Sequence, residues 1–216
     1  MLISALRSRV QRLGAPPLIT YYEGDSRISL SAITFANWVD KTANLIADLG
    51  HEDGEPIDLA LAESHPGHWV TLVWVAAAWQ RGCPVNPGVT GAEFLVVGPD
   101  DDRRADVTVA CSLHPLGRGF TTPPADAVDY VEVFAQPDVH DPSPLGESTV
   151  WAGSPVPATE PRSTKTLLTD PAAGWDTVAT ALVAPVLGGG STVVTVGMDD
   201  DAVARIAAEE KIPLDQ

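Results

Sequence analysis

Two histidines that lie close together in the sequence are the first residues with chemical potential. His65 and His68 flank a Pro-Gly pair, and Glu63 lies just before them. Imidazole and carboxylate groups bind zinc, but a zinc site in a protein normally takes three or four ligands. The Pro-Gly pair is typical of a loop that leads into a helix. We therefore predict a surface or helix-capping role for both histidines and no metal site.

No serine or cysteine has the sequence context of an activated nucleophile. The G-x-S-x-G pattern is absent, and the proline that follows Ser154 removes a backbone N–H that an oxyanion hole could use. Cys111 and His114 are near each other in the sequence, but sequence proximity alone does not make a catalytic dyad. The sequence predicts no catalytic residue.

Two further motifs have structural explanations. The glycines at 188–190 follow a predicted helix and precede a predicted strand, whereas a dinucleotide fingerprint has the strand first. We interpret them as the end of a helix. The acidic residues at 100–102 follow a predicted strand and could bind a cation. Consecutive carboxylates are more typical of a solvated turn, which is the role we predict.

The charge balance excludes several classes of partner. The chain has 216 residues, a formal net charge of −16 and a pI near 4.4. Such a surface repels phosphate backbones and anionic lipids, so we predict no binding of nucleic acid or membranes. Cys83 and Cys111 lie in unrelated contexts and are expected to be reduced thiols. Without a secretory signal, and with Trp69–Trp79 as the longest apolar run, we expect a soluble cytoplasmic protein.

Helices and strands alternate along the chain, which predicts an α/β fold with a mainly parallel sheet flanked by helices and an N-terminal β-hairpin. Apolar periodicity and turn residues predict helices at 2–13, 31–49, 68–81, 175–187 and 202–210, a hairpin at 18–30, and strands at 57–62, 94–97, 106–111, 164–169 and 191–196. We expect a single domain over residues 1–216, with an irregular Pro-rich insertion at about 112–161.

Two blocks of this sequence resemble a known family. Residues 28–88 contain a helix, a Gly-Asp-type turn, a buried strand and an apolar helix that ends in Gly82-Cys83-Pro84-Val85-Asn86-Pro87. Residues 166–196 contain a helix, a Gly-Gly turn and a valine-rich strand. This order is similar to the AMP-binding, acyl-adenylate-forming (acyl-CoA synthetase-like) enzymes. The resemblance implies part of the N-terminal domain of an acyl-adenylate synthetase.

The phosphate loop of that family is the main point of departure. Active relatives carry a loop rich in Ser, Thr and Gly, ending in Pro-Lys-Gly, which holds the ATP phosphates through hydroxyl and N–H groups. Here the corresponding segment is 150–165, with prolines at 155, 157 and 161. The resemblance implies that Gly153, Ser154, Thr159 and Lys165 are the remnant cofactor-binding positions of this loop. The sequence also stops before the family's aromatic-Thr-Glu motif and its C-terminal domain.

These departures predict a truncated, non-catalytic relative without a cofactor that acts as a binding or interaction module and forms a homodimer. An alternative is an adenine-nucleotide- or acyl-binding enzyme of the ligase class, an acid–thiol ligase or another adenylate-forming type, with a rebuilt loop at 150–165. ATP or AMP would then bind, and Lys165 would supply the positive charge. A third hypothesis is an unrelated small α/β domain whose likeness to the family arose by chance.

Overall fold

The computed structural model describes residues 2–88 and 91–212. Its helices are α1 (Leu2–Leu13), α2 (Ala32–Asp48), α3 (Leu61–Ser64), α4 (Trp69–Gln80), the 3₁₀ helix η1 (Tyr130–Ala135), α5 (Trp175–Val178), the π-helical turn η2 (Ala179–Val183), α6 (Ala184–Gly188) and α7 (Asp200–Glu209). Its strands are β1 (Pro17–Glu23), β2 (Ser26–Ser31), β3 (Asp58–Leu59), β4 (Phe94–Val97), β5 (Val107–Ala110), β6 (Val128–Asp129), β7 (Val150–Trp151), β8 (Ser154–Pro155), β9 (Lys165–Thr169) and β10 (Ser191–Val196).

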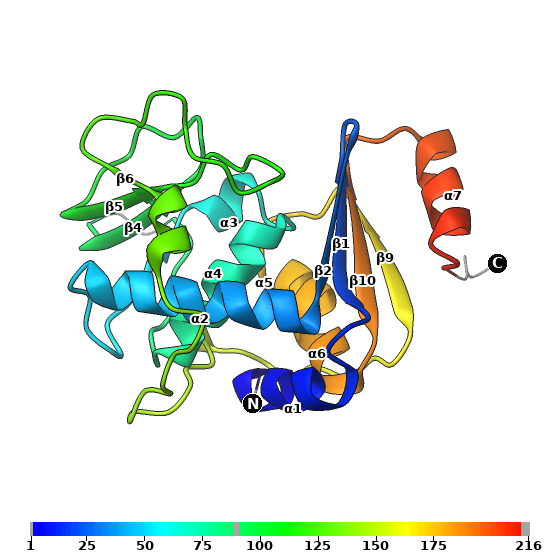
Figure 1. Cartoon of the computed structure of the whole chain (residues 1–216), viewed down its shortest axis with the longest axis horizontal. Coiled ribbons are helices and arrows are strands. Elements are labelled where there is room, and N and C mark those ends of the chain that lie inside the picture. The colour runs from blue at the N-terminus through cyan, green and yellow to red at the C-terminus, as the bar shows by residue number, and fades with distance from the viewer. Residues whose placement is uncertain (1, 89–90, 213–216) are drawn as a thin grey trace.

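The longer strands are divided between two four-stranded sheets (Figure 1). The first sheet has the order β2-β1-β10-β9, in which β1, β10 and β9 are parallel and β2 is antiparallel to β1. The second has the order β3-β4-β5-β6, and all its pairs are parallel. β7 and β8 form a separate small hairpin beside Val85, which bridges to Ile57 and to Trp151.

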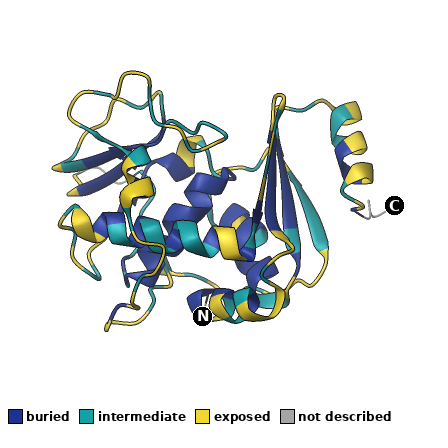
Figure 2. Cartoon of the chain, viewed as in Figure 1, coloured by how far each residue is buried: buried dark blue, intermediate teal, exposed yellow. Residues whose placement is uncertain are grey.

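Helices α2 and α4 lie between the two sheets and supply much of the core (Figures 1 and 2). Every residue of α4 is buried, which its apolar composition on all sides predicts. The segment α5–η2–α6 covers the inner face of the first sheet, and α7 covers its outer face. There Ile206 and Ala207 of α7 pack with Tyr22 and Val193. The central strands β1 and β10 are therefore buried on both faces, whereas β2 and β9 are partly exposed.

The helix starts follow local capping chemistry. The Ser31 hydroxyl oxygen accepts a hydrogen bond of 3.1 Å from the Thr34 N–H at the start of α2. The Asp199 carboxylate accepts one of 2.7 Å from the Ala202 N–H at the start of α7. Side-chain oxygens at this position satisfy N–H groups that have no partner within the helix. Ser31 therefore caps α2, and Asp199 caps α7.

The α/β class and the N-terminal hairpin are confirmed, but the predicted strands do not share one sheet. Sequence periodicity identifies a strand without identifying its partner, and the pairings here are distant, as for Ile19 of β1 with Thr192 of β10. The predicted strand at 57–62 is shortened to Asp58–Leu59, because the chain turns at Ala60 and begins α3 at Leu61. Periodicity does not separate a short apolar helix from a strand.

The predicted helix at 175–187 is present but interrupted by the π-helical turn η2. Pro185 lies two residues beyond this turn and has no N–H for the usual i to i−4 hydrogen bond. Proline within a helix forces such a local adjustment. Gly189 ends the helix in the left-handed conformation, with φ of 82°, which confirms the helix stop predicted for the glycines.

The long segment at 112–161 runs across α2 and is tied to it. The Tyr130 hydroxyl lies 2.6 Å from the Thr42 Oγ1, and the Asn44 side-chain amide donates to the carbonyls of Pro137 and Val139. The segment therefore packs as part of the structure although it contains little regular secondary structure. The single-domain organisation stays a prediction.

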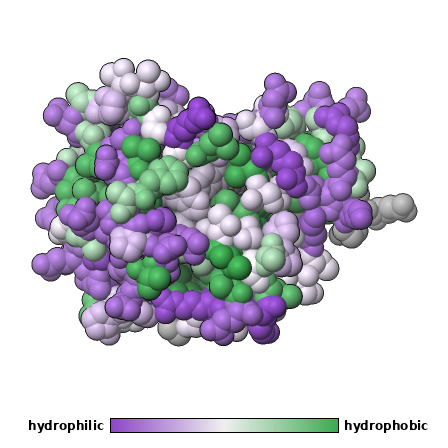
Figure 3. All heavy atoms as spheres, in the orientation of Figure 1, coloured by the Kyte–Doolittle hydropathy of each residue, from purple (hydrophilic) through white to green (hydrophobic). Residues whose placement is uncertain are grey.

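No helix within 2–88 or 91–212 has the length and apolar character to cross a membrane. Hydrophobic side chains are interspersed with hydrophilic ones on the face in Figure 3.

Candidate functional site

The segment at 150–165 begins with the tight hairpin β7–β8. Ala152 and Gly153 form its turn with φ of 50° and 74°, a left-handed conformation that favours glycine. The Ala152 N–H donates to the Val85 carbonyl at 2.9 Å, and the Gly153 N–H donates to Asn86 Oδ1 at 2.8 Å. The Val156 N–H donates back to the Thr149 carbonyl at 2.8 Å. These backbone donors therefore have partners within the protein.

After the hairpin, residues 156–164 form an extended strap that leads to β9. Pro157 and Pro161 contribute no N–H, and the Arg162 N–H donates to the Ala184 carbonyl at 2.9 Å. The Gly190 N–H donates to the Arg162 carbonyl at 3.0 Å. A Cβ at Gly190 would lie only 2.4 Å from the Thr164 carbonyl oxygen. The glycine-rich turn thus makes room for the backbone of the strap.

Lys165 lies at the start of β9 and pairs with Glu210 at the end of α7. Its Nζ donates to the Glu210 carbonyl at 2.8 Å and to Glu210 Oε2 at 2.9 Å. The same carboxylate accepts hydrogen bonds of 2.8 Å from the Tyr22 hydroxyl and from Arg27 Nη2. The cluster joins β1, β2, β9 and α7. Its burial raises the Glu210 pKa, but the three donors outweigh this effect and hold the pKa at about 2.

The predicted remnant positions are therefore distributed along the segment. Gly153 and Ser154 are exposed in the hairpin beside Asn86, whereas Lys165 is in the Glu210 cluster. Thr159 is half-buried in the strap between them. Lys165 binds Glu210, whereas the hairpin backbone binds Val85 and Asn86, so the two ends of the segment contact different parts of the protein. A nucleotide-binding role for these four residues stays a prediction.

The Glu210 cluster predicts a pH-dependent contribution to stability. Its folded pKa is depressed below the ordinary glutamate value, so its stabilisation is present above about pH 4.5 and is lost as the pH falls toward about 2. We expect Glu210→Gln to lower the free energy of unfolding by about 2 kcal/mol at pH 7. The difference from the wild type should shrink through that acid range. Urea unfolding at pH 7 and at lower pH measures it.

The matched control for this prediction is Glu209→Gln, which removes the same charge from an exposed neighbour in α7. Surface substitutions of this kind usually change stability by less than about 0.5 kcal/mol. An equal effect of both substitutions, or a Glu210→Gln effect that is independent of pH, would contradict a specific role for the cluster.

A cavity of about 170 Å³ lies where the loop between α3 and α4 meets the first sheet. It is lined by Tyr21, the residues at 64–68, Asp170, Pro171 and Val196. Val196 ends β10 and Asp170 follows β9, so the cavity lies at the carboxyl ends of parallel strands. This is the position at which open α/β sheets bind their ligands.

His68 is the N-cap of α4, and its Nδ1 accepts a hydrogen bond of 3.1 Å from the Val70 N–H. Its imidazole packs edge-on against the Tyr21 ring at a centroid distance of 4.6 Å. Burial lowers its pKa to about 3, and the nearby His65 adds to the effect. His65 is half-buried, with Nδ1 2.9 Å from Ser64 Oγ. The predicted helix-capping role is confirmed for His68.

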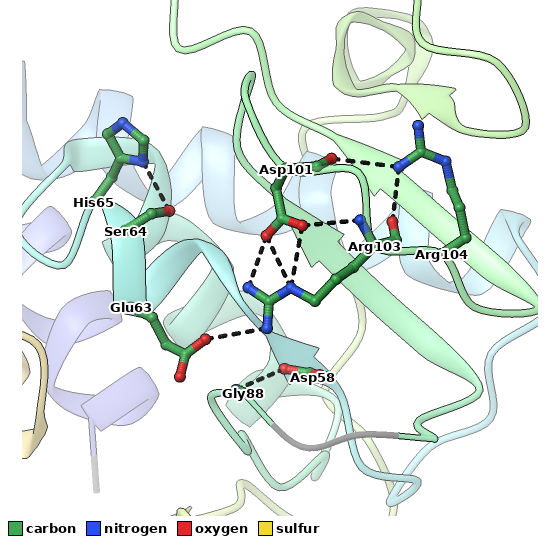
Figure 4. Close-up of polar contacts among 8 residues, drawn as sticks. All are labelled: Asp58, Glu63, Ser64, His65, Gly88, Asp101, Arg103 and Arg104. Atoms are coloured by element: carbon green, nitrogen blue, oxygen red, sulfur yellow. Dashed lines mark hydrogen bonds and ion pairs between the residues drawn. The ribbon is translucent and has the colours of Figure 1, made fainter.

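A second polar cluster joins α3 to the acidic turn (Figure 4). The Arg103 guanidinium binds both oxygens of Asp101 and contacts Glu63 at 3.2 Å. Arg104 donates to the backbone carbonyls of Asp101, Arg103 and Ala125. Asp100 and Asp102 are exposed, which confirms the predicted turn. The cations that line the adjacent cavity of about 210 Å³ thus already have partners.

The other residues that could carry out chemistry are buried or separated. Cys83 and Cys111 are buried and not in a disulfide, and burial raises the pKa of both thiols. His114 Nδ1 accepts a hydrogen bond of 3.1 Å from the Leu116 N–H, so this ring caps its own loop. Within the described residues, no three His, Cys, Asp or Glu side chains are grouped to hold a metal ion.

The fold is that of the N-terminal region of acyl-adenylate-forming ligases. The structure matches an acyl-CoA synthetase of Brucella canis with a TM-score of 0.69 and 16% identity, over 95% of this chain and 45% of that one. It matches the N-terminal domain of FACL13 from Mycobacterium tuberculosis with a TM-score of 0.69 and 13% identity, over 98% and 61%. A coronafacic acid ligase of Pectobacterium brasiliense gives 0.69 and 9%, over 97% and 48%. The chain thus spans about half the length of these solved proteins.

No protein-family model matches the sequence. The chain is 30% identical over 229 residues to the TIGR03089 family protein of Mycobacterium tuberculosis, an alignment that covers 91% of this chain and 89% of that protein. The chain belongs to the TIGR03089 family. The resemblance predicted from the sequence is confirmed at the level of the fold, and the hypothesis of an unrelated α/β domain is wrong.

Proposed function

We propose that this protein is a non-catalytic relative of the acyl-adenylate-forming ligases and acts as a binding or interaction module. The observation that carries the proposal is the hydrogen bonding of the segment at 150–165. The N–H groups of Ala152, Gly153, Val156 and Arg162 donate to other parts of the protein. A phosphate loop needs such donors directed at its ligand.

Electrostatics support the same proposal. Lys165 is the lysine of this segment that a phosphate site would use as its cation. Its Nζ lies 2.9 Å from Glu210 Oε2, so its charge is balanced within the protein. The net charge of −16 adds a repulsive field for a nucleotide triphosphate. Transfer of an adenylyl group depends on positive charge that stabilises the phosphates in the transition state. In this proposal no ATP, AMP or metal ion serves as a cofactor.

Calorimetric titration of the protein with magnesium ATP and with AMP tests the proposal. We expect no heat of binding above the heat of dilution, because the donors and the lysine of the segment are already engaged. We also expect no pyrophosphate exchange above background with a panel of carboxylic acids. The matched variant Lys165→Ala should leave both results unchanged.

The alternative remains a ligase-class enzyme that binds an adenine nucleotide or an acyl group through a rebuilt segment at 150–165. The exposed hydroxyl of Ser154 and the half-buried Thr159 favour it, since both are accessible to a ligand in the same segment as Lys165. Pyrophosphate exchange that requires a carboxylic acid and is abolished by Lys165→Ala would favour this enzyme. A nucleotide whose phosphates are coordinated by residues 151–166 would have the same consequence.

We further propose that the module is cytoplasmic and self-associates through the edge of its first sheet. β9 pairs with β10 alone among the described strands, so its other side is an open edge. Open edges of β-sheets are templates for pairing with another chain, and a two-fold axis beside β9 would extend the sheet. Light scattering of the purified protein tests this part: a dimer supports it, and a monomer at all concentrations contradicts it.

A further inference from the structure

The imidazole of His68 offers a hydrogen-bond donor to the cavity between the α3–α4 loop and the first sheet. His68 is 3% exposed, and its Nδ1 accepts from the Val70 N–H. A neutral imidazole with an acceptor at Nδ1 carries its proton on Nε2. The described residues offer that N–H no hydrogen-bond partner. Nε2 is not among the fully buried polar atoms that lack a partner, so a ligand or a water in the cavity can accept from it.

The shape of the cavity is set by close backbone packing. A Cβ at Gly67 would lie 2.3 Å from Pro171 Cγ, so only glycine lets the α3–α4 loop approach the chain after β9. Asp170 has φ of 43°, and its Oδ1 accepts a hydrogen bond of 2.7 Å from the Gly197 N–H. This bond fixes the carboxylate beside the cavity and leaves Oδ2 as a further acceptor.

The charges around the cavity restrict its ligand. Asp170 lines it, and Glu23 accepts a hydrogen bond of 3.2 Å from the hydroxyl of Tyr21, another lining residue. Burial lowers the pKa of His65, so this ring does not offset the two carboxylates at neutral pH. An anionic ligand would be repelled. Apolar contacts are available from Pro66, Pro171 and Val196.

We propose that this cavity binds a small uncharged molecule of the primary-amide type. The ligand carbonyl accepts from His68 Nε2–H, its N–H group donates to Asp170, and its apolar part packs against the prolines and Tyr21. The cavity of about 170 Å³ has room for several waters or for a ligand of the size of one ring with its amide. The inference rests on the proposed binding role. In an active enzyme the same cavity would instead hold the substrate.

The experiment compares benzamide with benzoate, which have nearly the same shape and differ in charge. Nitrogen-15 NMR of the wild-type protein follows His68 Nε2 and the backbone N–H of Gly197 during each titration. We expect benzamide to shift both signals in a saturable way and benzoate to bind at least about tenfold more weakly. Benzoate binding as tight as that of benzamide, or a benzamide titration that moves neither signal, overturns the inference.

Two variants separate the ligand contact from the capping role of His68. Asparagine and aspartate both cap helices well, but only asparagine keeps a side-chain N–H donor. We expect His68→Asn to retain benzamide binding within about threefold and His68→Asp to weaken it at least about tenfold. Equal losses in both variants would assign His68 to helix capping alone. Should either variant fail to fold, the wild-type comparison of benzamide with benzoate still decides.

This test and the nucleotide titration can fail independently. Heat of binding with magnesium ATP would overturn the non-catalytic proposal, whatever benzamide does. Absence of benzamide binding would overturn the amide site and leave the proposal for the segment at 150–165 intact.

Discussion

Replacing Gly190 with alanine is expected to destabilise the protein by about 3 kcal/mol, because a side chain there meets backbone that has no room to move. The new Cβ would lie 2.4 Å from the Thr164 carbonyl oxygen and 2.5 Å from that of Arg162. The same two residues accept hydrogen bonds from Gly190 and Ser191. Relief of the clash therefore requires separating the strap from the start of β10.

Gly189→Ala is the matched control in the neighbouring position. Gly189 has φ of 82°, and a Cβ there would meet nothing within 4 Å. Its substitution should cost only about 1 kcal/mol from the left-handed backbone. Thermal unfolding should place the Gly190→Ala midpoint roughly 6–12 °C below that of the wild type, with Gly189→Ala in between. Equal midpoints for the two variants would mean that the strap does not depend on close approach at Gly190.

These two glycines show which features the sequence predicts and which it does not. A glycine run after an apolar helix predicts the helix end, which depends on local conformation, and Gly189 confirms it. Sequence cannot indicate that the backbone at 162–164 packs against Gly190, since that contact joins segments whose path depends on the whole fold. The helices, the hairpin and the caps were predictable for the same local reason.

In the candidate sites, too, local features could be predicted from the sequence and contacts between distant segments could not. The capping role of His68 could be predicted from the Pro-Gly loop before a helix. Its place in one cavity with Asp170 could not, because about a hundred residues separate them and the packing of α4 against the first sheet depends on the whole fold. Lys165 lies at the end of the segment identified from the family resemblance, but its partner Glu210 comes from the last helix. Charge pairs between distant elements leave no pattern in the sequence.

Replacing Arg9 of α1 is expected to cause the second large loss of stability, because Arg9 is a buried cation that donates hydrogen bonds to backbone carbonyls. It is 3% exposed, and its Nη1 donates to the carbonyls of Pro185 and Gly190, while Nη2 lies 3.4 Å from that of Pro17. These bonds join α1 to the first residue of β1, to α6 and to the glycine-rich turn. The Arg9→Met variant keeps the apolar bulk but removes the charged donor, so the Gly190 carbonyl loses this bond while the Pro185 carbonyl keeps the Gly189 N–H. Hydrogen bonds from a charged group contribute about 1.5–3 kcal/mol each, so we expect a loss of about 4 kcal/mol.

The matched control is Arg12→Met, which removes the same charge from an exposed position of α1. Urea unfolding of both variants should show a loss of stability for Arg9→Met only, since surface changes usually stay within about 0.5 kcal/mol. The double variant Arg9→Met, Gly190→Ala should lose less than the sum of the single losses, because both changes open the same junction. Strict additivity would mean that α1 and the strap are held to the turn independently.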